Sequence, residues 1–194
     1  MPQQQNSLCQ QLVALARDST WLMPALTAVR ELNLDSWCIG AGVIRNLVWD
    51  CLHGYAEPSV LRDVDVAYFD ASNLATERDA ELQHRLKEKL THIPWEVTNQ
   101  AGVHLWFEGY FGHPVSPLTS LTEAVSTWPE YATSVGLTLM SDDTIEVIAP
   151  HGLDDLFGMM VRRNPTRVSI ETYRQRVIEK RYAERWPNVQ IVFA

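Results

Sequence analysis

The sequence LRDVDVAYFD, residues 61–70, has the apolar content of a buried β-strand but carries two aspartates. Alternate side chains of a strand share a face, so Asp63 and Asp65 project the same way, with Cα atoms about 6–7 Å apart. Two unpaired carboxylates at this spacing repel each other, and a shared divalent cation would keep both ionised. Mg²⁺ suits this pair, since Mg²⁺ binds one or two protein carboxylates and otherwise water and phosphates. The alternative is that both aspartates lie at the strand's exposed first end, with Asp63 paired to a basic residue.

The segment upstream predicts a phosphate-binding turn. A strand over residues 36–40 ends at Gly40-Ala41-Gly42, and the apolar residues that follow recur at helical spacing. The free N–H groups and the dipole of such a helix start favour a phosphate, and Gly42 has no Cβ to keep a ligand away from the backbone. Arg45, one turn into the helix, either meets the same phosphate or faces solvent. A dinucleotide-binding fingerprint would need a third glycine at position 45, so that reading is weakened.

Strands and helices alternate through the first half of the chain, which predicts an α/β sheet with helices packed on it. We expect one domain over 1–194, with N-terminal helices in 1–35, a sheet core in 36–150 and C-terminal helices in 151–194. The expected strands are 36–40, 63–69, 94–100, and pieces within 104–112 and 144–150. The expected helices are 6–17, 21–32, one from 44 onward, 76–90, 121–133, 153–163 and 169–185.

Composition excludes several classes of protein. With 46% apolar residues and no apolar run long enough for a bilayer, the chain is expected to be a soluble, cytoplasmic globular protein. Its three cysteines form no CxxC pair and its six histidines show no HExxH spacing, so neither a disulfide framework nor a zinc site is predicted. The net charge of −8 argues against binding of long nucleic acids.

The C-terminal stretch has the opposite charge. Eight of the 16 Lys and Arg residues fall between Arg162 and Arg185, against three acids. This stretch is either a solvated helix face or part of a wall that receives an anionic ligand. One smaller question stays open: Asn99 and Gln100 either orient a base or sugar or tie down a loop. The tryptophans, Trp106 and Trp128 among them, mostly follow the apolar rhythm and are assigned to the core.

A glycine-pair turn that opens a helix, followed by a strand with Asp-x-Asp, resembles the nucleotidyltransferase superfamily with the DNA polymerase β-type fold. More specifically, the chain is similar to a bacterial nucleotidyltransferase-like family from about Trp37 to Pro187. Five blocks carry the similarity in order: WCIGAGVIRNLVWD (37–50), DVDVAYFD (63–70), WEVTNQAGVH (95–104), IEVIAPHGLDDLFG (145–158) and YRQRVIEKRYAERWP (173–187).

The resemblance implies a mixed sheet core and assigns roles to the two motifs. Gly40 and Gly42 would form the turn that cradles a triphosphate, and Asp63 and Asp65 would hold the metals. The superfamily often has Ser after the first glycine. This chain has Ala41 there, so only backbone contacts to the phosphate are expected.

The superfamily usually adds a third carboxylate from the next strand, and Glu96 lies at the corresponding place, with Thr98 on the same face. Glu96 would be a third metal ligand or take the acceptor's proton; otherwise it is an exposed strand carboxylate. The implied activity is a Mg²⁺- or Mn²⁺-dependent transfer of a nucleoside monophosphate from an NTP to a hydroxyl of an unidentified acceptor, a small molecule, with release of pyrophosphate. The alternative is a catalytically silent module of the same fold that binds a nucleotide or a protein.

Overall fold

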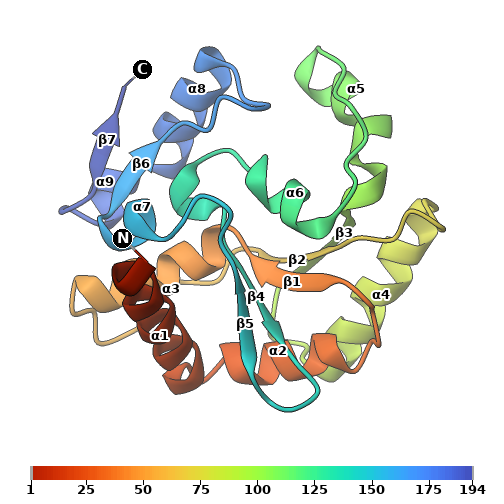
Figure 1. Cartoon of the computed structure of the whole chain (residues 1–194), viewed down its shortest axis with the longest axis horizontal. Helices are drawn as coiled ribbons and strands as arrows, with labels where there is room; N and C mark the ends of the chain where they lie inside the picture. Colours follow the sequence, from red (N-terminus) through yellow and green to blue (C-terminus); the bar gives the residue numbers. More distant parts are fainter. Residues whose placement is uncertain (1, 194) are drawn as a thin grey trace.

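A mixed five-stranded sheet lies across the middle of the molecule (Figure 1). The computed structural model describes residues 2–193. The strands of the sheet are β1 (Trp37–Gly40), β2 (Val64–Tyr68), β3 (Trp95–Asn99), β4 (Gly136–Leu139) and β5 (Ile145–Ile148). Their spatial order is β3-β2-β1-β4-β5. β2 and β3 are parallel, and the other neighbouring strands are antiparallel.

Helices cover both faces of the sheet. They are α1 (Pro2–Asp18), α2 (Leu22–Arg30), α3 (Gly42–Leu52), α4 (Thr76–Lys89), α5 (Phe107–Phe111), α6 (Leu121–Ser126), α7 (Asp154–Phe157), α8 (Ile170–Lys180) and α9 (Tyr182–Arg185). On one face α2 contacts β4 and α4 contacts β3. On the other face α6 lies over the sheet (Figure 1), where Leu121 and Val125 pack with Cys38 and Ala67. No helix of residues 2–193 has the length and apolar character needed to cross a membrane.

The side chains of β2 alternate between these faces. Val64 and Val66 belong to the main core, which also takes in side chains of the N-terminal and C-terminal helices. Asp65 and Ala67 therefore project from the opposite face. Glu96 on β3 is the register partner of Asp65 and projects from that same face. A strand of this sheet can carry a carboxylate because only one of its faces is buried in the main core.

The structure confirms the α/β architecture with a mixed sheet between N-terminal and C-terminal helices. The C-terminal segment is not wholly helical, however. It contains two short parallel strands, β6 (Met160–Arg162) and β7 (Gln190–Val192). The strand predicted over 63–69 begins at Val64, so Asp63 lies immediately before it.

The strand predicted within 104–112 is wrong, because this segment is helical. A 3₁₀ helix, η1 (Gln100–Leu105), runs into α5. The buried side chains here include Val103 and Phe107, which are four residues apart. In a strand Leu105 would share the face of these two residues, but it is 64% exposed, so the burial fits helical backbone and not a strand.

Three predicted helices are shorter than their apolar patterns. The helix expected over 121–133 ends at Ser126, because Pro129 lacks an N–H and disfavours helical backbone before it. The helix expected over 153–163 ends at Phe157, and Met159 adopts a left-handed φ of 53° before β6 begins. The helix expected over 169–185 is divided into α8 and α9 at Arg181, which has φ 51°.

Candidate functional site

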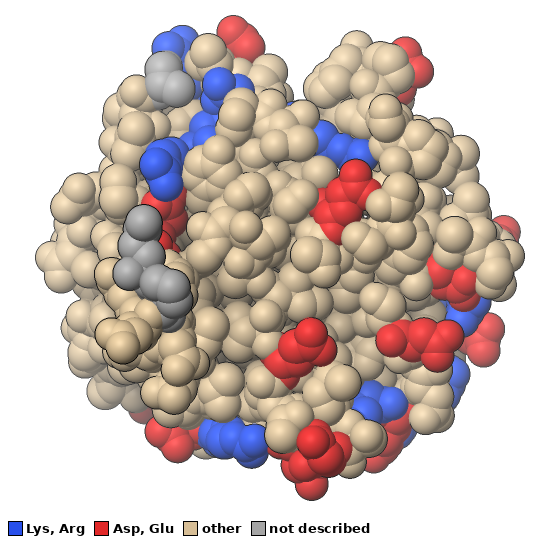
Figure 2. All heavy atoms as spheres, viewed as in Figure 1, with Lys and Arg blue, Asp and Glu red and all other residues tan. Residues whose placement is uncertain are grey.

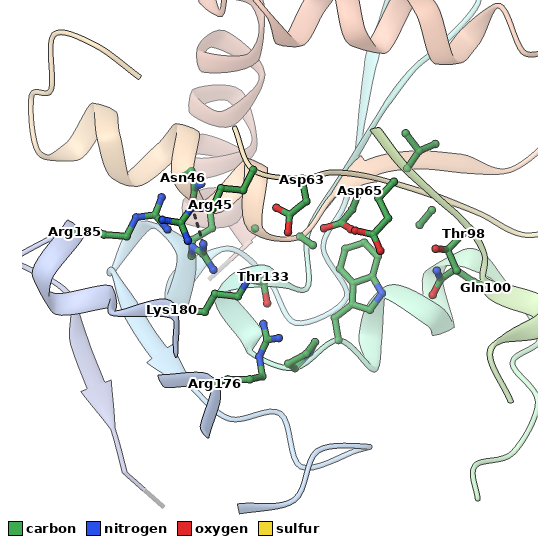
Figure 3. A pocket seen from close by; sticks show the side chains of 18 residues that line it. Arg45, Asn46, Asp63, Asp65, Thr98, Gln100, Thr133, Arg176, Lys180 and Arg185 are labelled. Carbon is green, nitrogen blue, oxygen red and sulfur yellow. Dashed lines mark hydrogen bonds between the residues drawn. The ribbon is translucent and has the colours of Figure 1, made fainter. Parts of the chain in front are cut away.

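The glycine turn before α3 and the Asp63-x-Asp65 motif meet in one open cavity of about 300 Å³, called here the carboxylate cavity (Figure 3). Of the seven predicted site residues, six line it: Ala41, Gly42, Arg45, Asp63, Asp65 and Glu96. Gly40 does not line it. A Cβ on Gly40 would come within 2.7 Å of the Trp128 ring and of the Val135 carbonyl oxygen, so close packing explains this glycine.

The three carboxylates approach from two neighbouring strands. Asp63 precedes β2, Asp65 lies on it, and Glu96 is its partner on the parallel strand β3. Burial raises the pKa of Asp65 to about 7, and the charges of Asp63 and Glu96 act in the same direction, against Lys180 and Arg176. The site therefore concentrates negative charge beside basic side chains, as a site for a cation and an anionic substrate would.

The turn before α3 has an unusual backbone. Ala41 has φ 59° and ψ −131°, a conformation that glycine adopts far more readily than alanine. Its N–H donates to the Val135 carbonyl oxygen at 3.0 Å, which ties the turn to the segment before β4. Gly42 begins α3 directly afterwards, so the first N–H groups of the helix are available at the cavity.

This backbone predicts a stabilising substitution. Ala41→Gly relieves the strain at positive φ and raises the free energy of unfolding by about 1 kcal/mol, measured by urea unfolding. Ala75→Gly is the matched control, because Ala75 also precedes a helix but has φ −69°. There the glycine only adds backbone entropy to the unfolded chain, so the control destabilises. A loss of stability in Ala41→Gly would contradict the assigned strain.

The prediction that Arg45 could face solvent is wrong, because this residue is only 4% exposed. Its guanidinium lies over the rings of Trp49, Tyr182 and Trp186, with Cζ to centroid distances of 5.3, 4.9 and 5.5 Å. One terminal nitrogen donates to the Asn46 side-chain oxygen at 2.7 Å, whereas Nε is buried without a partner among the described residues. This aromatic cage holds a positive charge beside the glycine turn.

Some basic residues of the C-terminal stretch line the cavity, as expected for a wall that receives an anionic ligand, and others do not. Arg176, Lys180 and Arg185 line the carboxylate cavity, and Figure 3 shows them opposite the strands that carry the aspartates. Others are engaged elsewhere: Arg162 pairs with Asp155 at 2.8 Å. Only part of the stretch is therefore a wall of the cavity, and the rest lies on the surface or in other contacts.

A buried ion pair fixes that wall, and nothing in the sequence pattern revealed it. The Glu130 side chain is 2% exposed and accepts hydrogen bonds from Arg176 Nε at 2.9 Å and from the hydroxyls of Tyr182 and Thr133 at 3.2 and 2.9 Å. Burial acts to raise the pKa of Glu130, but the charge and hydrogen bonds of Arg176 prevail and hold this pKa below its usual value. The pair attaches α8 to the segment before β4.

The structure also separates Asn99 from Gln100. Asn99 is buried, accepts from the Asp70 and Ala101 N–H groups at 3.0 and 3.1 Å and donates to the carbonyls of Asp70 and Asn73. It ties down a loop. Gln100 lines the carboxylate cavity instead.

Trp128 also lines the carboxylate cavity and is half-buried, so its assignment to the core is incomplete. Trp106 is 39% exposed, and for it the core assignment is wrong. Apolar rhythm alone cannot distinguish a tryptophan in the core from one in the wall of a pocket.

The donor atoms of the carboxylate cavity fit a hard divalent cation. Residues 2–193 contain no preassembled group of three or more acidic, His or Cys side chains that could hold a metal ion. Mg²⁺ does not require one, because one or two carboxylates together with substrate phosphates complete its shell. Burial, and after it the charges of Asp63 and Glu96, raise the pKa of Asp65, and a bound cation would favour its ionised form. The carboxylate oxygens of Asp63, Asp65 and Glu96 are thus suitable ligands.

Comparison with solved structures places this geometry among known folds. A structure determined by NMR and described as a CCA-adding enzyme head domain matches with a TM-score of 0.80 and 29% identity, covering 95% of this chain and 96% of that one. A CCA-adding enzyme in complex with CTP matches with a TM-score of 0.55 at 12% identity, over 94% of this chain and 43% of that one. A tRNA-processing enzyme complex matches with a TM-score of 0.52 at 19% identity, covering 87% of this chain and 43% of that one. This chain spans less than half the length of the latter two.

The sequence comparisons agree with the fold. No curated protein matches the chain significantly. A sequence model of a nucleotidyltransferase family matches residues 27–191, a range that begins within α2, ends in β7 and includes every residue assigned to the carboxylate cavity above. On this match this chain belongs to that nucleotidyltransferase family.

Proposed function

We propose that this chain transfers a nucleoside monophosphate from an NTP, with Mg²⁺ or Mn²⁺, to a hydroxyl of a small-molecule acceptor and releases pyrophosphate. One observation carries the proposal: a single cavity is lined by carboxylates of two adjacent strands, a glycine turn at a helix start and basic side chains of α8 and α9. The carboxylates suit a metal-bound phosphate, and the glycine turn and the basic side chains suit the negative charge of a triphosphate.

The triphosphate would lie between the start of α3 and the C-terminal helices. The N–H groups at Gly42 and the following residues donate to phosphate oxygens without a side chain in the way. Arg45, Lys180 and Arg185 supply positive charge on either side. Because Ala41 has no hydroxyl, the turn itself contributes only backbone donors.

The reaction takes place at the carboxylates. Asp63 and Asp65 would hold the divalent cation, which when bound neutralises charge on the reacting phosphates and the leaving pyrophosphate. Glu96, beside Asp65 in the sheet, is a third ligand or accepts the proton of the acceptor hydroxyl on its carboxylate. Pre-positioned charge of this kind, and not covalent chemistry by the protein, is what phosphoryl transfer demands.

The structural relatives support a nucleotide donor. One of them is a CCA-adding enzyme in complex with CTP, and its similarity to this chain concerns the fold. We propose a small acceptor for this chain because its net charge of −8 opposes the binding of a long polyanion.

The proposal is tested with labelled nucleotides. The protein is incubated with Mg²⁺, each NTP labelled at the α-phosphorus, and a filtered extract of cellular small molecules. We expect the label in a new compound, with one pyrophosphate released for each molecule formed. Release of inorganic phosphate instead would contradict the proposal, and recovery of unchanged NTP would favour the silent binding module.

A further inference from the structure

A second pocket, of about 250 Å³, opens beside the carboxylate cavity, and we call it the aromatic pocket. Its characteristic side chains are Val103, Trp106, Phe107, Phe111, Trp128 and Arg167. The two cavities are continuous, because they share Thr98, Gln100, Trp128, Pro129 and Arg176. In Figure 2 the surface is hollowed between the regions of α8 and α5, and basic side chains lie in the hollow.

The aromatic pocket lies beside the carboxylate cavity, away from three of that cavity's basic residues. Arg62, Lys180 and Arg185 line the carboxylate cavity and also an adjoining hollow on its other side. None of these three lines the aromatic pocket. In the close view, Asp65 lies between Lys180 and Thr98 (Figure 3). The continuous cavity thus runs from a basic end, lined by Arg62, Lys180 and Arg185, past the carboxylates, to an aromatic end that also contains Arg167 and the shared Arg176.

The chemistry of transfer assigns the two ends. The acceptor oxygen forms a bond to the α-phosphorus as the bond from that phosphorus to the pyrophosphate oxygen breaks, and the hydroxyl proton passes to a carboxylate such as Glu96. The entering and leaving oxygens lie on opposite sides of the phosphorus. Because the basic end suits the leaving pyrophosphate, the hydroxyl must approach from the aromatic end.

We infer that the aromatic pocket binds the acceptor, and that this acceptor is a small compound with an aromatic ring, a hydroxyl and an acidic group. This inference rests on the proposed function and specifies the acceptor. The ring packs on a wall of aromatic side chains, in which Phe107 and Phe111 have centroids 4.4 Å apart and Trp106 lies 6.3 Å from Phe107. The volume, about 250 Å³, lies slightly below the usual range for small-molecule pockets, which suits a small acceptor.

Arg167 provides the reason for the acidic group. Its guanidinium is held 5.6 Å from the Phe107 ring centroid, and one terminal nitrogen donates to the Ser116 carbonyl oxygen at 2.7 Å. None of the ion pairs found within residues 2–193 involves Arg167, and none of the side chains described around the aromatic pocket is acidic. Burial lowers the pKa of Arg167 against the charge of Glu123, which forms no ion pair with it and does not line the aromatic pocket. An anionic ligand complements such a site.

The test uses 3-(4-hydroxyphenyl)propanoate as a probe and follows the indole N–H signals of the ¹⁵N-labelled protein. We expect the probe to shift the signals of Trp106 and Trp128 and to leave that of buried Trp49 in place. Phe111→Ala and Arg167→Gln should each weaken probe binding about tenfold or more. Binding of Mg²⁺ with a non-hydrolysable NTP analogue should stay within about twofold of the wild type in both variants.

Two matched controls separate the pocket from its surroundings. Tyr110 is on the same helix as Phe111 but is 80% exposed and does not line the aromatic pocket, and Arg174 is an exposed residue of α8. Tyr110→Phe, which keeps the ring that packs edge-on against Trp106, and Arg174→Gln should bind the probe like the wild type.

The failures of the two proposals differ. If Phe111→Ala weakens the NTP analogue and not the probe, the pocket holds the nucleobase and the inference is overturned. If the probe shifts neither indole signal, or if a short RNA binds there and the probe does not, the inference is also overturned. If the NTP analogue does not bind the wild type at all, the proposed function itself fails.

Discussion

Asp65→Asn is expected to abolish nucleotidyl transfer, with pyrophosphate release reduced by about 1,000-fold or more, and to stabilise the metal-free protein. Activity is lost because a carboxylate that would hold the cation becomes an amide. Stability is gained because the folded chain no longer has to bury a charge beside Asp63 and Glu96. We expect the free energy of unfolding at pH 8 to rise by roughly 2–4 kcal/mol, from the raised pKa and its linkage to folding.

The pH dependence of this stabilisation has a definite sign. Since the pKa of Asp65 is raised to about 7 in the folded state, the carboxyl keeps its proton there while the unfolded chain has already lost it. Wild-type stability therefore falls between the unfolded pKa near 4 and pH 7, and the advantage of Asp65→Asn appears over the same interval. Urea unfolding at pH 4 and pH 8 with chelator measures it. An equal effect at both pH values would contradict the assigned pKa.

Glu146→Gln is the matched control for this variant. Glu146 is also a strand carboxylate, but it is exposed on β5 and lines neither cavity. Its replacement should change neither pyrophosphate release nor unfolding. A comparable loss of activity in Glu146→Gln would show that the carboxylates of β2 and β3 have no special role.

Glu130→Gln is expected to cause the largest loss of stability, about 3–5 kcal/mol, because it leaves the charge of Arg176 without its buried partner. Thermal or urea unfolding at pH 7 measures the change. The pKa of Glu130 is held below its usual value in the folded state. The stabilisation is therefore present above the unfolded pKa and is lost as the pH falls through the folded one, so the wild type and Glu130→Gln should converge in acid.

An exposed ion pair of the same region is the control for that prediction. Arg181 and Glu184 pair on the surface, with side chains 66% and 60% exposed. Water and salt screen such a pair, so Glu184→Gln should unfold like the wild type. If Glu130→Gln did so as well, the buried ion pair would not hold the cavity wall together.

The sequence predicted the parts of the site that depend on local patterns. A glycine turn before a helix and two aspartates at alternate positions are visible without a fold, and both line the carboxylate cavity. The burial of Arg45 could not be predicted, because its cage is built by Tyr182 and Trp186 from the far end of the chain. The pairing of Glu130 with Arg176 is invisible for the same reason, since it depends on how α8 packs.

The errors in secondary structure also have physical causes. Residues 104–112 are rich in aromatic side chains, which favour strands, but Phe107 alone among them is buried, so the alternating burial of a strand is absent. The strand β4 was not predicted. It is short and begins at Gly136. Its strand conformation depends on its own hydrogen bonds to β1 on one side and to β5 on the other. Tertiary context decided both segments against their local preference.

The central claim is that Asp63 and Asp65 bind a metal-bound nucleotide in the carboxylate cavity. Its most direct test is calorimetric titration of an α,β-methylene NTP analogue into the wild type and into Asp63→Asn, with Mg²⁺ and with chelator. We predict binding to the wild type that requires Mg²⁺ and is weakened at least about tenfold in Asp63→Asn. Equal affinity of both proteins, with or without Mg²⁺, would contradict the claim.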